Sequence, residues 1–363
     1  DKIISLVTSN VNQHLATEIN VEKINFSIIQ TFPFASVNFH NVYALSTDNF
    51  NSGHFQTNTD TLFYIERISF KFNPILLIQK NYKVNNIDIV NGNIDLYADR
   101  NGEVNYIFWK KNPDQPPRQS LDLRMENVNL KNVHISYVNA AKSFKLTLFS
   151  DHGKIRGAYD GGLLNLQTDI NLLLHDLKVK DLDYQINEKI NVLSTLVIDK
   201  RKISVADGWV HTNGMKFKVD GNIELFEETE LDLTINAERI DIVRFISLLP
   251  LSFKEKLKNY NSSGDFDFST RIYGIISHRQ QPMLKTDFAI RNGQIQKKRS
   301  RAALNNIYLK GTLSNGSNQQ LRTSKISIQS FKGSFQGNEL TGILHIKNLL
   351  SPSIDGRIKG SVD

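Results

Sequence analysis

The sequence contains no cysteine, and no apolar run in it approaches the roughly 18 residues that a bilayer-spanning helix requires. Without cysteine the chain can form no disulfide, no thiolate nucleophile and no metal site with sulfur ligands. The chain begins on a helical pattern, with no signal peptide before Asp1, and ends within a strand-like pattern over 354–362. We therefore expect a segment of a longer protein, with any membrane anchor ahead of Asp1.

Motifs of the common enzyme and nucleotide-binding classes are also missing. There is no G-x-S-x-G elbow, no H-E-x-x-H pair, no G-x-G-x-x-G fingerprint and no complete phosphate loop. The segment 311–316 lacks the lysine of a phosphate loop and falls between strands, so we interpret it as a turn. The histidines are scattered, and neither a zinc-finger nor an aromatic RNA-binding pattern occurs. We predict a chain without enzyme activity, cofactor, metal or nucleic-acid partner.

The composition is that of a folded chain, with 40% hydrophobic and 22% charged residues. Its 363 residues suit two domains or one elongated array. The formal charge of +7 arises from 44 basic and 37 acidic residues that are spread along the chain. A diffuse positive charge favours approach to anionic lipid surfaces, because basic side chains are attracted to them.

Alternation of apolar and polar residues is the main pattern of the sequence. A period of two is typical of strands, whose side chains point to opposite faces of a sheet. Asn-Gly and Asp-Gly pairs stand between the alternating runs, and such pairs adopt positive φ at little steric cost, which favours hairpin turns. We predict a mainly β fold built as a long antiparallel meander. The turn pairs begin at Asn91, Asn101, Asp160, Asp207, Asn213, Asp220, Asn292 and Asn315.

Helical patterns are few and short. An apolar stripe from Ile3 to Leu15 predicts an N-terminal amphipathic helix. Proline suits the first helical position, so a short helix is expected to begin at Pro74 with Asn73 as its cap.

The longest helical region is expected near 241–259. Asp241 is placed to cap its first helix, and Pro250 interrupts the backbone hydrogen bonds there. Ser252 and Glu255 have the spacing of a capping box, which predicts the start of a second helix.

A proline-rich segment interrupts the alternation and indicates a domain boundary. Residues 111–120 contain several prolines and almost no other apolar side chain, as exposed linkers do. We therefore expect an N-terminal unit over 1–110, a linker loop over 111–120, and a longer β array over 121–363 that carries the helical insertion.

Each predicted strand has one apolar face, yet the long helices that usually cover a large sheet are absent from the sequence. Two sheets could pack on each other as a sandwich, or one sheet could curl into a trough that shelters apolar ligands. Periodicity alone does not separate these arrangements.

Three stretches resemble the AsmA family of Gram-negative envelope proteins. The first is the opening helix followed by the strands at 21–27 and 37–42, with Phe-Pro between them. The second, over 68–106, joins a strand, a short Pro-Ile-Leu-Leu helix, and the runs YKVNNIDI, GNIDLY and DRNGEVNY. The third includes Leu-Leu-Pro at 248–250, the helix after it, GDFDF at 264–268 and the later glycine-marked strands.

The resemblance implies an elongated, curled antiparallel sheet that forms an apolar groove with a few short helices. It further implies a periplasmic protein, anchored in the inner membrane ahead of Asp1, that binds phospholipid acyl chains. Such proteins are similar to bridge-like lipid-transfer proteins, so inter-membrane lipid transport, outer-membrane homeostasis and envelope protein partners are the expected biological setting.

The candidate lining of the groove consists of apolar side chains from the alternating runs. Each could equally serve as ordinary core packing. The candidates are Ile24, Phe26, Ile28, Val37, Phe39, Phe70, Phe72, Ile87, Ile89, Ile94, Leu96, Val133, Ile135, Leu146, Leu148, Leu164, Leu166, Leu172, Phe217, Val219, Leu231, Leu233, Phe266 and Phe268.

Several alternatives stay open at this stage. Asp99, Asn101 and Glu103 have the alternate spacing of a calcium loop but lack its remaining ligands, so a hairpin turn is the simpler interpretation. The basic run over 297–301 either contacts lipid head groups or forms a solvated hairpin. The rival functions are a β-sandwich scaffold module of the envelope and a glycan hydrolase with two acidic residues in a cleft.

Overall fold

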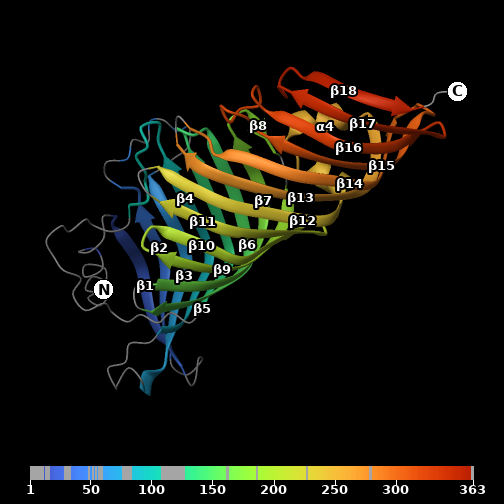
Figure 1. Ribbon diagram of the computed structural model, residues 1–363. Coiled ribbons are helices and arrows are strands. Elements are labelled where there is room, and N and C mark those ends of the chain that lie inside the picture. The colour runs from blue at the N-terminus through green and yellow to red at the C-terminus, as the bar shows by residue number, and fades with distance from the viewer. Residues whose placement is uncertain are drawn as a thin grey trace. The chain divides into compact units, whose positions relative to one another are not determined.

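The computed structural model of the chain is mainly β, with short helices (Figure 1). It describes residues 12, 17–27, 34–47, 50, 53, 55, 60–75, 84–107, 127–160, 163–184, 187–225, 228–277 and 280–360. The chain divides into two compact units, Asp1–Leu196 and Val197–Asp363, and this boundary falls within strand β9. Each unit is described by itself.

The N-terminal unit is a sheet in which each strand pairs with its neighbour in the sequence. All of these pairs are antiparallel except one, and β7 also pairs with β9. Its strands are β1 (Ile19–Ser27), β2 (Ala35–Leu45), β3 (Thr61–Phe72), β4 (Val84–Ala98), β5 (Asn127–Asn139), β6 (Phe144–Asp160), β7 (Leu163–Val179), β8 (Leu182–Asp183) and β9 (Glu188–Asp199).

The exception is the pair β4 and β5, which run parallel, with Asn86 opposite Asn127 and Ala98 opposite Asn139. A purely antiparallel meander is therefore wrong at this point. Parallel neighbours require a connection that returns the chain to the end where it started, and the long segment between these strands allows that. The expected linker over 111–120 belongs to this segment and lies outside the described residues, so the domain boundary placed there stays a prediction.

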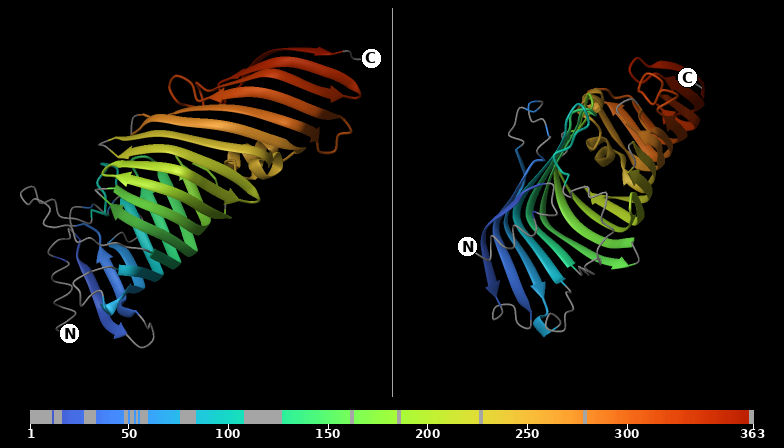
Figure 2. Two further views of the ribbon diagram at one scale, coloured as in Figure 1. Left: turned by 60° about the horizontal axis from the view of Figure 1, so that its bottom comes forward. Right: turned by 90° about the vertical axis from the view of Figure 1, so that its left-hand side faces the viewer.

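The C-terminal unit is an antiparallel sheet whose strands follow one another in chain order. Two short helices, α3 (Ile242–Ser247) and α4 (Leu251–Leu257), interrupt it and lie against one face of the curled sheet (Figure 2). Its strands are β10 (Lys202–Thr212), β11 (Met215–Leu225), β12 (Thr229–Asp241), β13 (Tyr260–Ile276), β14 (Met283–Lys297), β15 (Ala303–Ser314), β16 (Lys325–Phe335), β17 (Asn338–Lys347) and β18 (Ser353–Gly360).

Register aligns the apolar residues of the N-terminal unit on one face. One row across the strands consists of Phe26, Val37, Phe70, Ile87, Val128 and Ile155, each paired with the next. The opposite face is polar. There the Asp88 carboxylate accepts a hydrogen bond of 2.7 Å from the side-chain amide of Asn129 and forms an ion pair of 2.7 Å with the Lys71 ammonium group. The alternation in the sequence therefore separates an apolar face from a polar one, as predicted.

A row of unpaired residues crosses the N-terminal sheet at one level, and we call it the kink row: Glu22, Asn41, Glu66, Asn91, Asn132 and Asp151. Its three asparagines adopt positive φ, between 49° and 55°. Their side chains form lateral hydrogen bonds, from Asn91 to Glu66 at 2.6 Å and from Asn132 to Asn91 at 3.1 Å. Each strand thus gains one residue at the same level, and the apolar face continues beyond it.

The C-terminal sheet has true β-bulges, in which two residues of one strand lie opposite one residue of the next. Register shifts occur between most neighbouring strands, for example at Ala237/Ile240 in β12 and Ile290/Gly293 in β14. Positive-φ residues lie within these bulges, among them Arg239 and Asn292. Bulges increase local twist and bend the strand that carries them, so their repetition accounts for the curl of this sheet.

The hairpin turns expected at Asn-Gly and Asp-Gly pairs are confirmed at some pairs and wrong at others. Asn213 and Gly214 form a tight hairpin turn with positive φ at both residues. The pairs beginning at Asn91, Asp207, Asp220 and Asn292 instead lie within strands. A residue that tolerates positive φ serves a bulge or a kink as well as a turn, so the dipeptide alone does not distinguish them.

The N-terminal amphipathic helix over residues 3–15 lies outside the described residues, apart from Asn12, which is helical. At the second predicted helix, Pro74 and Ile75 are helical, and the Asn73 carboxamide oxygen accepts a hydrogen bond of 3.0 Å from the Ile75 amide. That capping residue was correctly predicted.

We predict that Gly264→Ala destabilises the C-terminal unit by about 3 kcal/mol. Gly264 has φ +136° at a bulge, and a Cβ atom there would lie 2.8 Å from the Gly293 Cα atom. Gly274→Ala is the matched control, because its φ is +100° but no atom lies within 4 Å of the added Cβ. The control should cost only about 1 kcal/mol. Urea unfolding monitored by circular dichroism measures the free energy of unfolding of both variants. An equal loss of stability in the two variants would contradict the close approach of the strands at Gly264.

Candidate functional site

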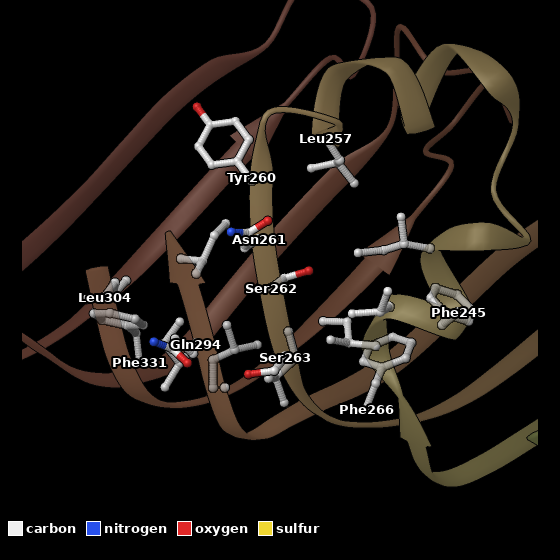
Figure 3. Close-up of a pocket in the computed structure, with 18 of the residues that line it drawn as sticks. Phe245, Leu257, Tyr260, Asn261, Ser262, Ser263, Phe266, Gln294, Leu304 and Phe331 are labelled. Carbon is white, nitrogen blue, oxygen red and sulfur yellow. The ribbon is translucent and has the colours of Figure 1, made fainter. Parts of the chain in front are cut away.

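A cavity of about 820 Å³ lies in the C-terminal unit, on the face of the sheet that carries α3 and α4 (Figure 3). We call it the groove. Strands β13 to β18 form its floor, and residues of both helices contribute to its lining.

Two rows of directly paired residues define the apolar floor. The first consists of Phe266, Ile290, Leu309, Phe331, Gly342 and Ile358, on successive strands from β13 to β18, and all of them line the groove. The second consists of Phe268, Phe288, Gly311, Ile328 and Leu344, and its last two residues line the groove.

Glycine makes room for aromatic rings within these rows. A Cβ atom at Gly311 would lie 2.7 Å from the Phe288 ring, which covers this glycine from the neighbouring strand. At Gly342, which pairs with Phe331, an added Cβ atom would lie 2.5 Å from the Arg357 carbonyl oxygen on β18. Neither position therefore has room for a larger side chain, and glycine is required at both.

Helix α3 covers one part of the apolar face. The Asp241 carboxylate caps it by accepting hydrogen bonds of 2.9 Å from the amides of Val243 and Arg244, as predicted. Phe245 then packs on the sheet, with ring centroids 4.7 Å from Phe266 and 5.6 Å from Phe268. Beneath and beside these rings lies the buried cluster Met215, Phe217, Ala237 and Ile240.

Helix α4 contributes the edge of the groove, and its start differs from the prediction. Pro250 is its N-cap, with no side-chain hydrogen bond, so the capping box expected at Ser252 and Glu255 is wrong. The Pro250 carbonyl accepts hydrogen bonds from Phe253 and Lys254, so the helix starts before Ser252 and encloses it. Leu257, one turn after Phe253, lines the groove (Figure 3).

Beyond α3 the apolar floor stays open. Within the described parts of 197–363, no second sheet packs on this face. Ile358, the last residue of the first row, is 59% exposed although it lines the groove. The C-terminal unit therefore has the curled, non-sandwich arrangement that the family resemblance implies.

One edge of the groove is polar and basic. Tyr260, Asn261, Ser262 and Gln294 lie along its β13 and β14 side (Figure 3). Three lysines, Lys254, Lys258 and Lys298, also line it, and the lining contains no aspartate or glutamate. The groove thus combines an apolar floor with a positively charged edge.

Few of the predicted lining residues lie in the groove itself. Phe266 does, and Phe268 lies in the adjacent row under Phe245. Phe217 is part of the buried cluster, whereas Val219, Leu231 and Leu233 belong to β11 and β12, away from the groove.

The other candidates belong to the N-terminal unit, where register and spacing place the described ones on its single apolar face. Val133 is buried, most others are half-buried, and Phe26 is 63% exposed. Ile28 lies outside the described residues. On this face are Ile24, Phe26, Val37, Phe39, Phe70, Phe72, Ile87, Ile89, Ile94, Leu96, Val133, Ile135, Leu146, Leu148, Leu164, Leu166 and Leu172.

Most of the groove was missed from the sequence. Its floor after β13 uses Ile290, Ile295, Leu304, Ile307, Leu309, Ile328, Phe331 and Leu344. The period-two signal for these residues is present in the sequence, but bulges shift its phase within β14, β15 and β16. Counting a phase shift at Asn292-Gly293 could have connected the runs of β14, whereas β15 and β16 contain no Asn-Gly pair to mark their bulges.

The possible calcium loop at 99–103 is a turn in the structure. The Asp99 carboxylate accepts hydrogen bonds from the amides of Asn101, at 2.7 Å, and Glu103, at 2.9 Å, which makes an ordinary turn. No cluster of three or more potential metal ligands occurs in the described portion of the chain. Of the basic run over 297–301, only Lys298 lines the groove.

Groups with displaced pKa values lie outside the groove. Burial raises the pKa of the Asp95 carboxyl, and burial together with the neighbouring Tyr137 raises the pKa of the Tyr106 hydroxyl. Hydrogen bonds from Arg271 lower the pKa of Asp232. None of these acids is part of the groove lining, so the groove contains no perturbed acid–base pair.

Comparison of the chain with protein-family models, with curated proteins and with solved structures found no match. In the part of the chain that the structure describes, no helix combines the length and apolar character needed to cross a bilayer.

We predict that Asp241→Ala lowers the free energy of unfolding of the C-terminal unit by about 1 kcal/mol, since it removes the two capping hydrogen bonds of α3. Asp241→Asn should retain almost all of the stability, because asparagine caps a helix equally well. Thermal and urea unfolding of the two variants provide the comparison. An equal loss in both variants would mean that the charge of Asp241, and not its capping geometry, stabilises α3.

Proposed function

We propose that this protein binds lipid acyl chains non-covalently in the groove of its C-terminal unit. The observation that carries the proposal is an open cavity of about 820 Å³ with a floor of directly paired apolar residues on six successive strands. Cavities that bind small organic ligands typically have volumes of about 300–1,000 Å³ and mainly apolar linings.

The length of the floor suits an acyl chain. Crossing from β13 to β18 takes five inter-strand steps of about 4.8 Å, or about 24 Å in all. One leaflet of a bilayer contributes about 15 Å to its hydrocarbon core. An acyl chain of ordinary length can therefore lie along the floor.

The energetics also favour this class of ligand. Each methylene group transferred from water into an apolar site contributes about 0.8 kcal/mol. About ten buried methylenes then contribute about 8 kcal/mol, a sum comparable with the cost of immobilising a ligand. Binding along a uniform apolar floor depends on buried area and not on individual hydrogen bonds, so it should tolerate different acyl chains.

The proposal involves no covalent chemistry. A glycan hydrolase would require two carboxyl groups facing each other across the substrate, and no carboxylate lines the groove. We accordingly favour a binding role over the hydrolase alternative.

The wider setting follows from the resemblance to the AsmA family. In this proposal the chain is the periplasmic part of an inner-membrane-anchored protein, phospholipids are its ligands, and the groove supports inter-membrane lipid transport and outer-membrane homeostasis. Envelope protein partners belong to the same proposal. The scaffold module is the rival function, and it requires no lipid in the groove.

We predict that the purified chain carries lipid detectable by native mass spectrometry and extraction, and that after delipidation it binds a fluorescent fatty acid. Leu309→Glu should weaken that binding at least about tenfold, because it places a carboxylate on the apolar floor.

Tyr308→Glu is the matched control, since Tyr308 precedes Leu309 on β15, is 38% exposed and lies outside the groove lining. It should bind the probe as the wild type does. If the wild-type chain neither carries lipid nor binds the probe, the lipid-binding proposal is wrong and the scaffold function is favoured.

A further inference from the structure

We infer that the groove prefers lipids with an anionic phosphate head group, and that Lys254, Lys258 and Lys298 bind this phosphate at its polar edge. The inference rests on the proposed function, because it assigns the head group of the lipid whose acyl chain lies on the floor.

The three lysines come from two segments that meet at one place. Lys254 and Lys258 are four residues apart on and just after α4, a spacing that places them on one helix face. The Lys298 amide donates a hydrogen bond of 2.8 Å to the carbonyl of Asn259, which directly follows Lys258. This bond holds Lys298 beside the end of α4, and all three side chains line the groove.

The charge of this edge is not balanced within the groove. No carboxylate belongs to the lining, so no negative charge in the lining offsets the positive charge of the three lysines. Lys258 pairs with Glu255, which lies outside the lining, and the Lys254 ammonium group is 3.4 Å from the Ser247 carbonyl oxygen. Lys298 forms no ion pair with any described residue. A dianionic or monoanionic phosphate is complementary to such a site.

Neutral donors lie on the same side. Tyr260 and Ser262 line the groove from one face of β13, where Ser262 pairs with the floor residue Ile295, and both side chains carry a hydroxyl group. They can donate to phosphate or glycerol oxygens.

Polar and apolar parts of the lining are separated along the groove. The sequence of β13 changes from Tyr260, Asn261 and Ser262 to Phe266, and the floor beyond it is apolar as far as Ile358 (Figure 3). A phosphate at the lysines would therefore leave the acyl chain to follow the row from Phe266 towards β18.

A simpler role for two of these lysines is stabilisation of helix ends, because cations near the last turn interact with unpaired carbonyl groups. Lys254 does contact the end of α3. That role predicts no preference among lipids, so binding measurements separate the two.

The test compares phosphatidic acid with diacylglycerol carrying the same acyl chains, each presented to the full delipidated chain in neutral detergent micelles. The wild type should bind phosphatidic acid about tenfold more tightly, as expected for a few partly exposed ion pairs. Replacing Lys254, Lys258 and Lys298 together by Gln should abolish this preference, so that the two lipids bind with equal affinity.

The control replaces Lys256, Lys297 and Lys310 by Gln, which removes the same charge from the same unit outside the groove lining. It should retain the preference, and circular dichroism verifies that both triple variants are folded. Inorganic phosphate at equal concentration should not compete, because it lacks the acyl chain.

The other outcomes contradict either the head-group inference or the acyl-binding function. Equal binding of both lipids by the wild type, or a preference retained in the groove variant, overturns the head-group inference while the acyl-binding function stands. Strong competition by inorganic phosphate would reassign the lysines to a free-anion site. Failure of both lipids to bind the wild type rejects the proposed function itself.

Discussion

An apolar sheet face must be shielded from water, and the structure of the C-terminal unit depends on how far this shielding extends. Helix α3 shields the part over β11 to β13, where Phe245 packs on Phe266 and Phe268 above a small buried cluster. Past that point the described residues offer no cover, and the floor is protected only by the curl of the sheet. The groove is the part of this apolar face that no helix covers. The hydrophobic effect favours covering such a surface.

Curl depends in turn on residues that interrupt the strand pairing. In the C-terminal unit bulges recur from strand to strand, and in the N-terminal unit the kink row gives each of strands β1 to β6 an unpaired residue at one level. Asparagine is suited to these positions, since it tolerates positive φ and its carboxamide can bond to the neighbouring strand, as Asn132 does to Asn91. The interruptions bend the backbone while the apolar residues stay on one face.

The sequence predicted strands, their apolar face and the cap of α3 because these features depend on local periodicity and on single side chains such as Asp241. It did not predict the parallel pairing of β4 and β5, since that depends on the path of a long connection. It placed Phe266 but not Leu309 or Phe331 in the groove, because each bulge shifts the period-two phase by one residue. Which apolar residues are left uncovered is a property of tertiary packing, and α3 decides it in this unit.

An open apolar floor lowers stability, because exposed floor residues such as Ile358 gain only part of the free energy that full burial provides. Larger side chains at Gly311 or Gly342 could not close the groove, because an added Cβ atom would lie 2.7 Å from the Phe288 ring or 2.5 Å from the Arg357 carbonyl oxygen. A ligand that binds only the folded state stabilises it by an amount that grows with the logarithm of the ligand concentration relative to the Kd. On the lipid-binding proposal, an acyl chain on the half-exposed floor therefore restores part of the stability that the open groove lacks.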